Sequence, residues 1–208
     1  MDNILPLLVI VLGIGILIGI IVWMMQRHKK LNKLKHIFYS EFADKHKLSH
    51  RSDKYMMAML NTVQGNWNGY PFAVFEEMQG SGNSKQIYTY AVFENVRFDF
   101  NFKIGKEHIF SKTEKLLGLK GIEFGDTEFD KKFLIKANDE DKFRAFFNQH
   151  LQDELKSIKN DLVSSIRLDN GVLSYYHYGP LLNEKKFHSF EQVISFMMKL
   201  IEEHEKKS

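Results

Sequence analysis

A long uncharged apolar segment near the start of the chain constrains the fold more than any other feature. From Ile4 to Met25 no residue is charged, and fifteen of residues 4–22 are Leu, Ile or Val. At about 1.5 Å per residue, a helix of about 22 residues would reach roughly 33 Å, enough to cross the hydrocarbon core of a bilayer. We therefore expect residues 1–26 to form a single transmembrane anchor.

The residues on either side of this segment argue against a cleaved signal peptide and set the orientation of the anchor. No positive side chain precedes the segment, and Trp23-Met24-Met25-Gln26 lacks the small residues of a cleavage site. Positive charge follows it instead, so the positive-inside bias places the N-terminus outside and the remaining chain in the cytoplasm. We expect the basic residues to contact anionic lipid headgroups: Arg27, Lys29, Lys30, Lys33 and Lys35.

Two glycines inside the apolar segment suggest a contact between two anchors. Gly15 and Gly19 match the spacing of small residues that lets two membrane helices approach closely. This face is therefore a candidate contact for a homodimer through the membrane helix, although it is the less favoured of two interpretations. The alternative is that glycine is simply common in membrane helices.

Charge is distributed unevenly along the 208 residues. Residues 27–54 carry a net charge of +6, whereas residues 55–208 carry −2. A nucleic-acid-binding domain would place basic residues on the folded domain itself, so we expect no nucleic-acid partner. The chain has no cysteine, which excludes disulfides, thiolate metal sites and a cysteine nucleophile.

The basic segment 27–54 is expected to form an amphipathic juxtamembrane helix. Its apolar stripe recurs every three or four residues, at Leu31, Leu34, Phe38 and Phe42. We favour a stalk that packs on the following domain over a helix that lies on the membrane surface. His46 and His50 have the spacing of two metal ligands on a helix, but no third ligand is near, so we interpret them as solvated and expect no metal.

Residues 55–208 are expected to form one cytosolic α+β domain. Its antiparallel sheet should have six or seven strands and pack a Phe-rich face against the helices 139–159 and 189–205. Asn170-Gly171 marks a tight hairpin, Gly65 to Gly69 a turn and Gln79 to Ser84 a hairpin connection. Asn138, and Ser189 with Gln192, match the pattern of helix caps. The expected strands are 70–78, 86–94, 96–104, 128–137, 162–168 and 172–178, and further helices are expected at 55–63 and 112–117.

The order of these segments resembles a family of uncharacterised bacterial membrane-anchored proteins, of the domain-of-unknown-function type. Three stretches over residues 60–205 carry the resemblance. Gly65-Asn66-Trp67-Asn68-Gly69-Tyr70-Pro71-Phe72 precedes a strand, Thr127-Glu128-Phe129-Asp130-Lys131-Lys132-Phe133 opens a strand that leads into a long helix, and Leu181-Leu182 precedes the last helix. The resemblance implies one or two membrane helices followed by a cytosolic α+β domain. It implies no site residues.

No pattern of catalytic residues is evident in the sequence. The strand that ends in Tyr175-Tyr176-His177-Tyr178 contains the best candidate, His177, for acid–base chemistry, although we favour an ordinary β-strand with a polar outer face. We therefore expect a non-catalytic interaction or scaffold domain that binds lipid headgroups or an unknown protein partner, without a cofactor. The alternatives are a membrane-tethered hydrolase or transferase with an unrecognised site, and a lipid-binding module that uses the Phe-rich sheet.

Overall fold

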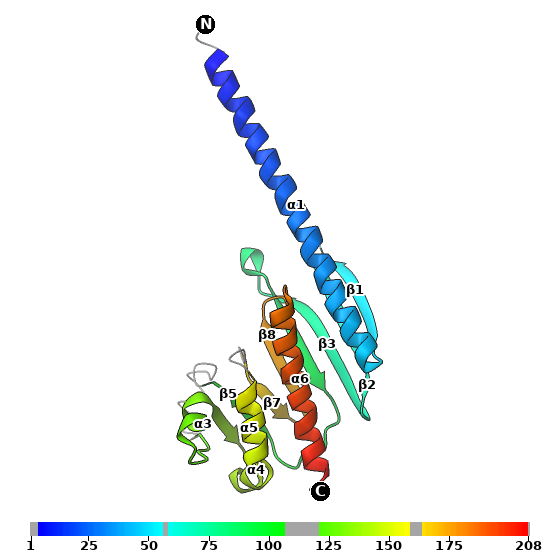
Figure 1. Ribbon diagram of the computed structural model, residues 1–208, viewed down its shortest axis with the longest axis vertical. Coiled ribbons are helices and arrows are strands. Elements are labelled where there is room, and N and C mark those ends of the chain that lie inside the picture. The colour runs from blue at the N-terminus through cyan, green and yellow to red at the C-terminus, as the bar shows by residue number, and fades with distance from the viewer. Residues whose placement is uncertain (1–3, 56–57, 107–120, 159–163, 208) are drawn as a thin grey trace.

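The computed structural model describes the whole chain except residues 1–3, 56–57, 107–120, 159–163 and 208 (Figure 1). The side chains of residues 4–11 also lie outside the description, as does the helix expected at 112–117. The described part is an α+β fold, as predicted. It combines one antiparallel sheet with a long helix at each end of the chain.

The sheet has eight strands in the order β1-β2-β3-β4-β8-β7-β5-β6, rather than the six or seven expected. Asn-Gly turns at residues 68–69 and 170–171 close the β2–β3 and β7–β8 hairpins, and all four residues have positive φ, as a type I′ turn requires. The strands are β1 Ser49–Tyr55, β2 Ala58–Trp67, β3 Tyr70–Gln79, β4 Gln86–Phe93, β5 Phe102–Gly105, β6 Leu134–Ala137, β7 Ile166–Asp169 and β8 Val172–Tyr178.

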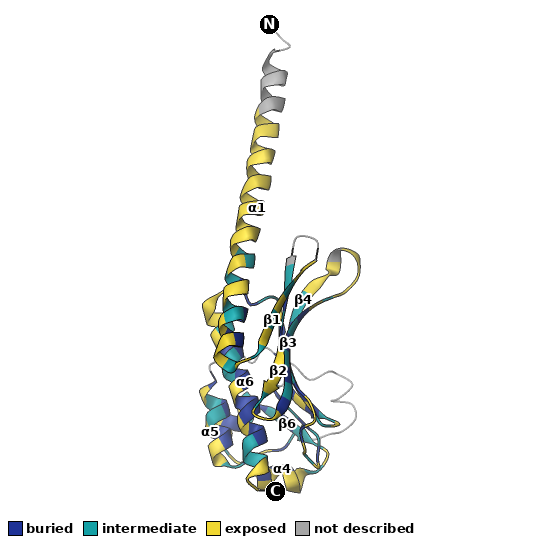
Figure 2. Ribbon diagram, turned by 90° about the vertical axis from the view of Figure 1, so that its right-hand side faces the viewer, coloured by how far each residue is buried: buried dark blue, intermediate teal, exposed yellow. Residues whose placement is uncertain are grey.

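The described helices cover one face of the sheet, as Figure 2 shows, and leave the other face open. The core between helices and sheet is rich in phenylalanine, as predicted, and Phe93, Phe143 and Phe147 are fully buried. The helices are α1 Ile4–His46, α3 Thr127–Lys132, α4 Glu140–Phe146, α5 Gln149–Ser157 and α6 Glu184–Glu205, with a short 3-10 helix, η1, at Gly82–Ser84.

Helix α1 runs for 43 residues and projects far beyond the domain (Figure 1). We call residues 12–30 its bare half, because every one of them is exposed (Figure 2). Large apolar side chains from Leu12 to Met25 are 46–60 % exposed. Among the described residues, no helix meets the length and hydropathy expected of a membrane span.

The second part of α1, residues 31–46, packs on β1 and β2, and we call it the seated half. Tyr39, Phe42 and Ala43 are buried in the core, and Phe38 stacks on Phe187 of α6 with ring centroids 5.3 Å apart. Residues 31–46 of the expected helix 27–54 thus pack on the domain, whereas residues 49–54 belong to β1. The expected division between the segment 27–54 and the domain 55–208 would fall inside β1.

Two segments of the sheet differ from the prediction. Residues 58–67 form β2 and not a helix. Their apolar residues follow no clear helical or strand period, so pairing with β1 and β3 determines the conformation. Of the expected strand 96–104, only the end belongs to β5. The preceding residues are tied by isolated hydrogen bonds, such as that from Val96 N to Gly171 O at 3.0 Å. Their alternation reflects burial of Phe100 and Phe102 rather than a strand ladder.

Helix caps account for the remaining differences. Residues 127–132 form α3 instead of a strand, because the Asp126 carboxylate accepts the first N–H groups of the helix. The expected helix 139–159 is two helices, α4 and α5, capped by Asp139 and Asn148 and not by Asn138. Helix α6 begins after its cap, Asn183, so the capping box expected at Ser189 is wrong.

Candidate functional site

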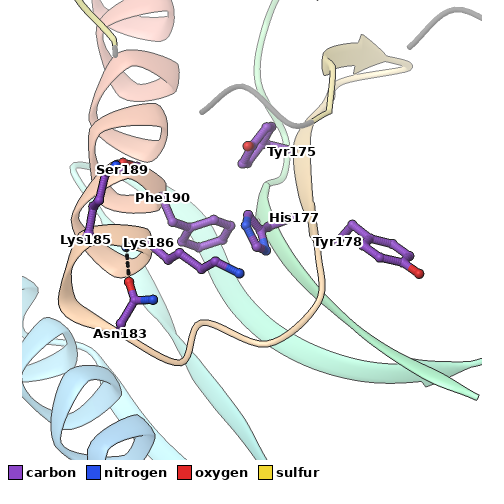
Figure 3. Close-up of a pocket in the computed structure, with 8 residues that line it drawn as sticks. All are labelled: Tyr175, His177, Tyr178, Asn183, Lys185, Lys186, Ser189 and Phe190. Carbon is purple, nitrogen blue, oxygen red and sulfur yellow. Dashed lines mark hydrogen bonds between the residues drawn. The ribbon is translucent and has the colours of Figure 1, made fainter. Parts of the chain in front are cut away.

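A pocket of about 510 Å³ opens where β8 ends and α6 begins (Figure 3). Among the described residues, its polar lining consists of two lysines, one histidine, one asparagine and one serine, together with tyrosine side chains, and includes no carboxylate. Strand β8 supplies one wall and the first turns of α6 supply the other. The lining residues are Tyr175, His177, Tyr178, Asn183, Lys185, Lys186, Ser189 and Phe190.

The first turn of α6 positions the lysines. The Asn183 side chain accepts the N–H of Lys186 at 2.9 Å, which fixes the start of the helix. Figure 3 shows the Lys186 side chain reaching toward His177 and Tyr178 pointing away from the pocket. The pocket therefore combines the Lys186 ammonium group with the positive end of a 22-residue helix.

His177 is only 6 % exposed, and its ring forms part of the pocket wall. Its Nδ1 lies 3.0 Å from the carbonyl oxygen of Gly179. A carbonyl oxygen only accepts hydrogen bonds, so Nδ1 carries a proton and Nε2 is the ring atom that can gain or lose one. The hydrogen bond holds the ring against the end of β8.

His177 ends a row of polar residues that crosses the helix-covered face of the sheet. Ser52 pairs with Asn61, Glu76 pairs with Thr89, and Thr89 pairs with His177. The Asn61 side chain joins the two parts through a hydrogen bond from Nδ2 to Glu76 Oε2 at 3.0 Å. We call these five residues the polar row.

The neighbouring residues of the same face show how unusual this row is. The adjacent cross-strand set is entirely buried and largely apolar, and comprises Val63, Val74, Ala91 and Tyr175. Burying polar groups is unfavourable unless each finds a partner, so a complete polar row in a core is a candidate functional feature. The row and the pocket meet at His177.

A buried ion pair links the polar row to α1 and corrects one prediction. Lys35 was expected to contact lipid headgroups, but its side chain is only 2 % exposed and lies against the sheet. Its Nζ is 2.8 Å from Glu76 Oε2 and donates to the carbonyl oxygen of Met59 at 2.7 Å. The prediction of a headgroup contact is wrong for Lys35, because this residue lies on the face of α1 that packs on β2.

Two buried oxygen atoms beside this ion pair have no hydrogen-bond partner, Glu76 Oε1 and Tyr39 Oη. Burial and the nearby Glu76 carboxylate hold the pKa of the Tyr39 hydroxyl well above its usual value. The hydroxyl therefore stays protonated beside the negative charge of Glu76.

The other residues singled out from the sequence are separated from this pocket. Arg27, Lys29, Lys30 and Lys33 are exposed along α1, and Gly15 and Gly19 lie in its bare half. His46 ends α1 and packs its ring on Trp67, whereas His50 lies in β1 and contacts Asn61. The two histidines do not share a helix, and no cluster of metal-binding side chains is found among the described residues.

The described lining of the pocket can be compared with what acid–base catalysis requires. A histidine base needs a nucleophile or substrate proton within hydrogen-bond reach and a group that orients it. His177 has the orienting carbonyl, and the described lining residues include no carboxylate beside it. Two lysines and an amide are hydrogen-bond donors in this lining, next to an aromatic wall.

Comparisons with known proteins yielded no match, whether to protein-family models, to curated proteins or to solved structures. The resemblance to a family of membrane-anchored proteins therefore stays a prediction.

Proposed function

We propose that the chain is a single-pass membrane protein whose cytoplasmic α+β domain is a non-catalytic binding module. The observation that carries the proposal is the division of α1. Its bare half exposes apolar side chains all round, whereas its seated half buries one face in the domain. A helix that is apolar on every side needs an apolar medium, and the run from Ile4 to Met25 is long enough for a bilayer.

The charges beside the bare half support the proposed orientation. Arg27, Lys29, Lys30 and Lys33 are exposed immediately after the apolar run and favour the cytoplasmic side. In that arrangement they would lie near anionic headgroups, each contributing about 1 kcal/mol to the interaction with the membrane surface. Lys35 takes no part in it.

The glycine pair supports a parallel dimer of the anchor. Counting about 100° per helical residue, Gly15 and Gly19 lie on the side of α1 opposite to Lys35. Two helices that meet through these glycines would therefore direct their domains away from each other. The domains would not obstruct the dimer.

The open face of the sheet favours a protein partner. Cross-strand pairing brings together Phe75 with Tyr90, Tyr90 with Tyr176, and Tyr88 with Tyr178 on this face. Tyr176 and Tyr178 are 36 % and 49 % exposed. Tyrosine is enriched at protein interfaces because it combines a large apolar ring with a polar end.

The two alternatives have less support. A lipid-binding module would need an enclosed apolar cavity, but Phe100, Phe102 and Phe143 contact one another in the core. A hydrolase or transferase would need more converging ionisable groups than the described pocket provides.

Membrane extraction of the full chain tests the anchor. We expect the chain to stay in the membrane pellet after alkaline carbonate washing. A variant with Leu17→Arg and Ile18→Arg should be released, because two arginines raise the insertion free energy by about 5–7 kcal/mol. The matched control, Lys29→Arg with Lys30→Arg, should stay in the pellet, and release of the unmodified chain would contradict the proposal.

Photo-crosslinking in cells tests the binding module. A photoreactive residue at Tyr178, on the open face, should give one reproducible protein adduct. The same residue at Lys131, on the exposed side of α3, should not give that adduct. Equal labelling at both positions would contradict a specific interface.

A further inference from the structure

We infer that the tip of the β3–β4 hairpin lies in the headgroup layer of the membrane and holds the domain against the membrane surface. We call residues 80–85 the hairpin tip. The inference rests on the proposed function, since it requires α1 to span a bilayer, and it adds a second contact from a segment distant in the sequence. Three features lead to it, namely the height of the tip along α1, the strand ladder that supports it and its composition.

Two contacts align β3 with α1 and set the height of the hairpin tip. Phe42 packs on Phe72 with ring centroids 6.2 Å apart, and Lys35 pairs with Glu76 at 2.8 Å. The helix and the strand therefore run in opposite directions, and seven residues of α1 correspond to four residues of β3. Because a helix rises about 1.5 Å per residue and a strand about 3.3 Å, both spans are roughly 10–13 Å long.

The same correspondence places the hairpin tip beside the end of the apolar run. Four residues beyond Glu76 the chain reaches Gly80, and seven residues before Lys35 the helix has His28, which is three residues beyond Met25. Figures 1 and 2 both show this hairpin extending alongside α1 toward its bare half. Three helical residues span about 4.5 Å, and each headgroup layer is about 5–8 Å thick. The tip is therefore at the height of the headgroups.

A continuous strand ladder supports the hairpin tip. Strands β3 and β4 pair without interruption up to Gln79 and Gln86. Beyond them, the backbone N–H and the hydroxyl of Ser84 donate to the carbonyl oxygen of Ser81 at 3.1 and 2.6 Å. Gly80 has a φ of 107°, and a Cβ atom there would lie 2.6 Å from the Ser84 carbonyl oxygen, so this tight turn requires glycine. The tip is thus a closed turn whose height is set by the ladder.

The composition of the hairpin tip suits a surface of lipid headgroups. No acidic residue occurs between Glu77 and Glu94, and Lys85 adds a positive charge. Ser81, Ser84 and Lys85 are exposed. Hydroxyl and ammonium groups donate hydrogen bonds to phosphate oxygens, and lysine is attracted to an anionic leaflet.

A second contact would fix the orientation of the sheet relative to the membrane. The hairpin and α1 extend from the domain in the same direction (Figure 1). With both at the membrane, the strands would stand on its surface, and the open face with Tyr176 and Tyr178 would be presented sideways. The proposed protein partner would then approach along the membrane and not from the depth of the cytoplasm.

The test uses single-cysteine variants of the full chain in vesicles of phosphatidylcholine and phosphatidylglycerol. The chain has no cysteine of its own, so a fluorophore can be attached at one position at a time. A fluorophore at Ser81→Cys should be quenched by a nitroxide on the lipid headgroups. The matched control is Asp141→Cys, which is exposed in the first turn of α4 at the far end of the domain and should keep its emission (Figure 1).

A third position separates this inference from the proposed anchor. A fluorophore at Leu17→Cys should be quenched by a nitroxide deep in the acyl chains. If it is quenched while the fluorophore at Ser81 stays as bright as that at Asp141, the inference is overturned and the anchor stands. If the fluorophore at Leu17 is not quenched, the anchor fails, and the inference fails with it.

A change of charge at the hairpin tip provides a second measurement. Lys85→Glu should reduce the quenching at Ser81 several-fold in vesicles rich in phosphatidylglycerol, because the new carboxylate is repelled by the anionic surface. Lys131→Glu makes the same change on the exposed side of α3 and should leave the quenching as it is. Both variants should melt like the native chain, since both side chains are exposed. Equal effects of the two variants would overturn the inference, because they would indicate general charge attraction.

Discussion

The two halves of α1 belong to one continuous helix but have opposite surfaces. In the bare half, Leu12 to Met25 are apolar and exposed on every side. In the seated half, only Lys35, Tyr39, Phe42 and Ala43 are buried, and they lie on one face. Helical structure is the same in both, so the surface pattern alone distinguishes a helix that needs an apolar medium from one that needs a protein partner.

The buried lysine sharpens this comparison. Five basic residues follow the apolar run, and they look equivalent in the sequence. One of them, Lys35, enters the core and pairs with Glu76, which fixes the position of α1 on the sheet. Buried charges in a core determine a specific arrangement more than they add stability. We therefore expect the ion pair to favour this position of α1 on the sheet over others.

The largest effect is expected when this ion pair is broken. Glu76→Gln leaves the Lys35 ammonium buried without its counter-charge and should lower the free energy of unfolding by about 3–5 kcal/mol. Chemical denaturation of the full chain in detergent would measure the loss. A double variant, Lys35→Met with Glu76→Leu, should recover most of it, because no charge is then left in the core. A single variant as stable as the native chain would contradict the role of the pair.

An alanine in each half of α1 provides the next test. Phe42→Ala removes a buried ring that contacts Trp67 and Phe72, and should lower the free energy of unfolding by about 3 kcal/mol. Leu17→Ala, in the bare half, should leave domain stability unchanged because its side chain touches no part of the domain core. The same denaturation assay measures both, and equal losses would erase the distinction between the halves.

A smaller effect is expected at the glycines of the bare half. Gly15→Leu with Gly19→Leu should weaken self-association of the full chain in membranes several-fold, because bulky residues hold two helices apart. Energy transfer between labelled chains in vesicles would measure it. Leu17→Ala, on the side of the helix facing Lys35, is the control and should leave transfer unchanged. Equal effects of both changes would contradict the proposal that two helices meet through Gly15 and Gly19.

The smallest effect concerns His46 at the end of the seated half. Burial, followed by the positive charge of Lys45, lowers the pKa of His46 below its ordinary value of 6.5. The unfolded chain then binds more protons, so stability should fall as the pH drops below 7 and through the lowered pKa. His46→Gln should remove this part of the pH dependence. His28→Gln, in the bare half, should retain it, and an unchanged slope in His46→Gln would contradict the assignment.

Much of the fold follows from local patterns. The Asn-Gly turn at 170–171, the alternating strands and the amphipathic stripe of the last helix predict an α+β domain, which the structure confirms. Errors arose where one pattern fits two structures. Phe129 and Phe133, four residues apart, fit a helix as well as one face of a strand, and the cap at Asp126 decides the helix.

The candidate site was harder to predict, because residues far apart in the sequence build it. Among its lining, the sequence singled out only His177. Lys186 resembles any solvated lysine at the start of a helix, and the polar row exists only through strand register, as in the pairing of Thr89 with His177. The alternation of β3 includes Glu76 at an inward position, and this inward carboxylate was the one signal for a buried polar site.

The most direct test of the central claim is protease accessibility of a tag at Ser208 in right-side-out and inverted membrane vesicles. The proposed division of α1 predicts that the tag is protected in right-side-out vesicles and cleaved in inverted ones. This result would place the domain, with its pocket and open sheet face, in the cytoplasm. Cleavage in right-side-out vesicles would contradict the orientation, and a tag recovered in the soluble fraction would contradict the anchor itself.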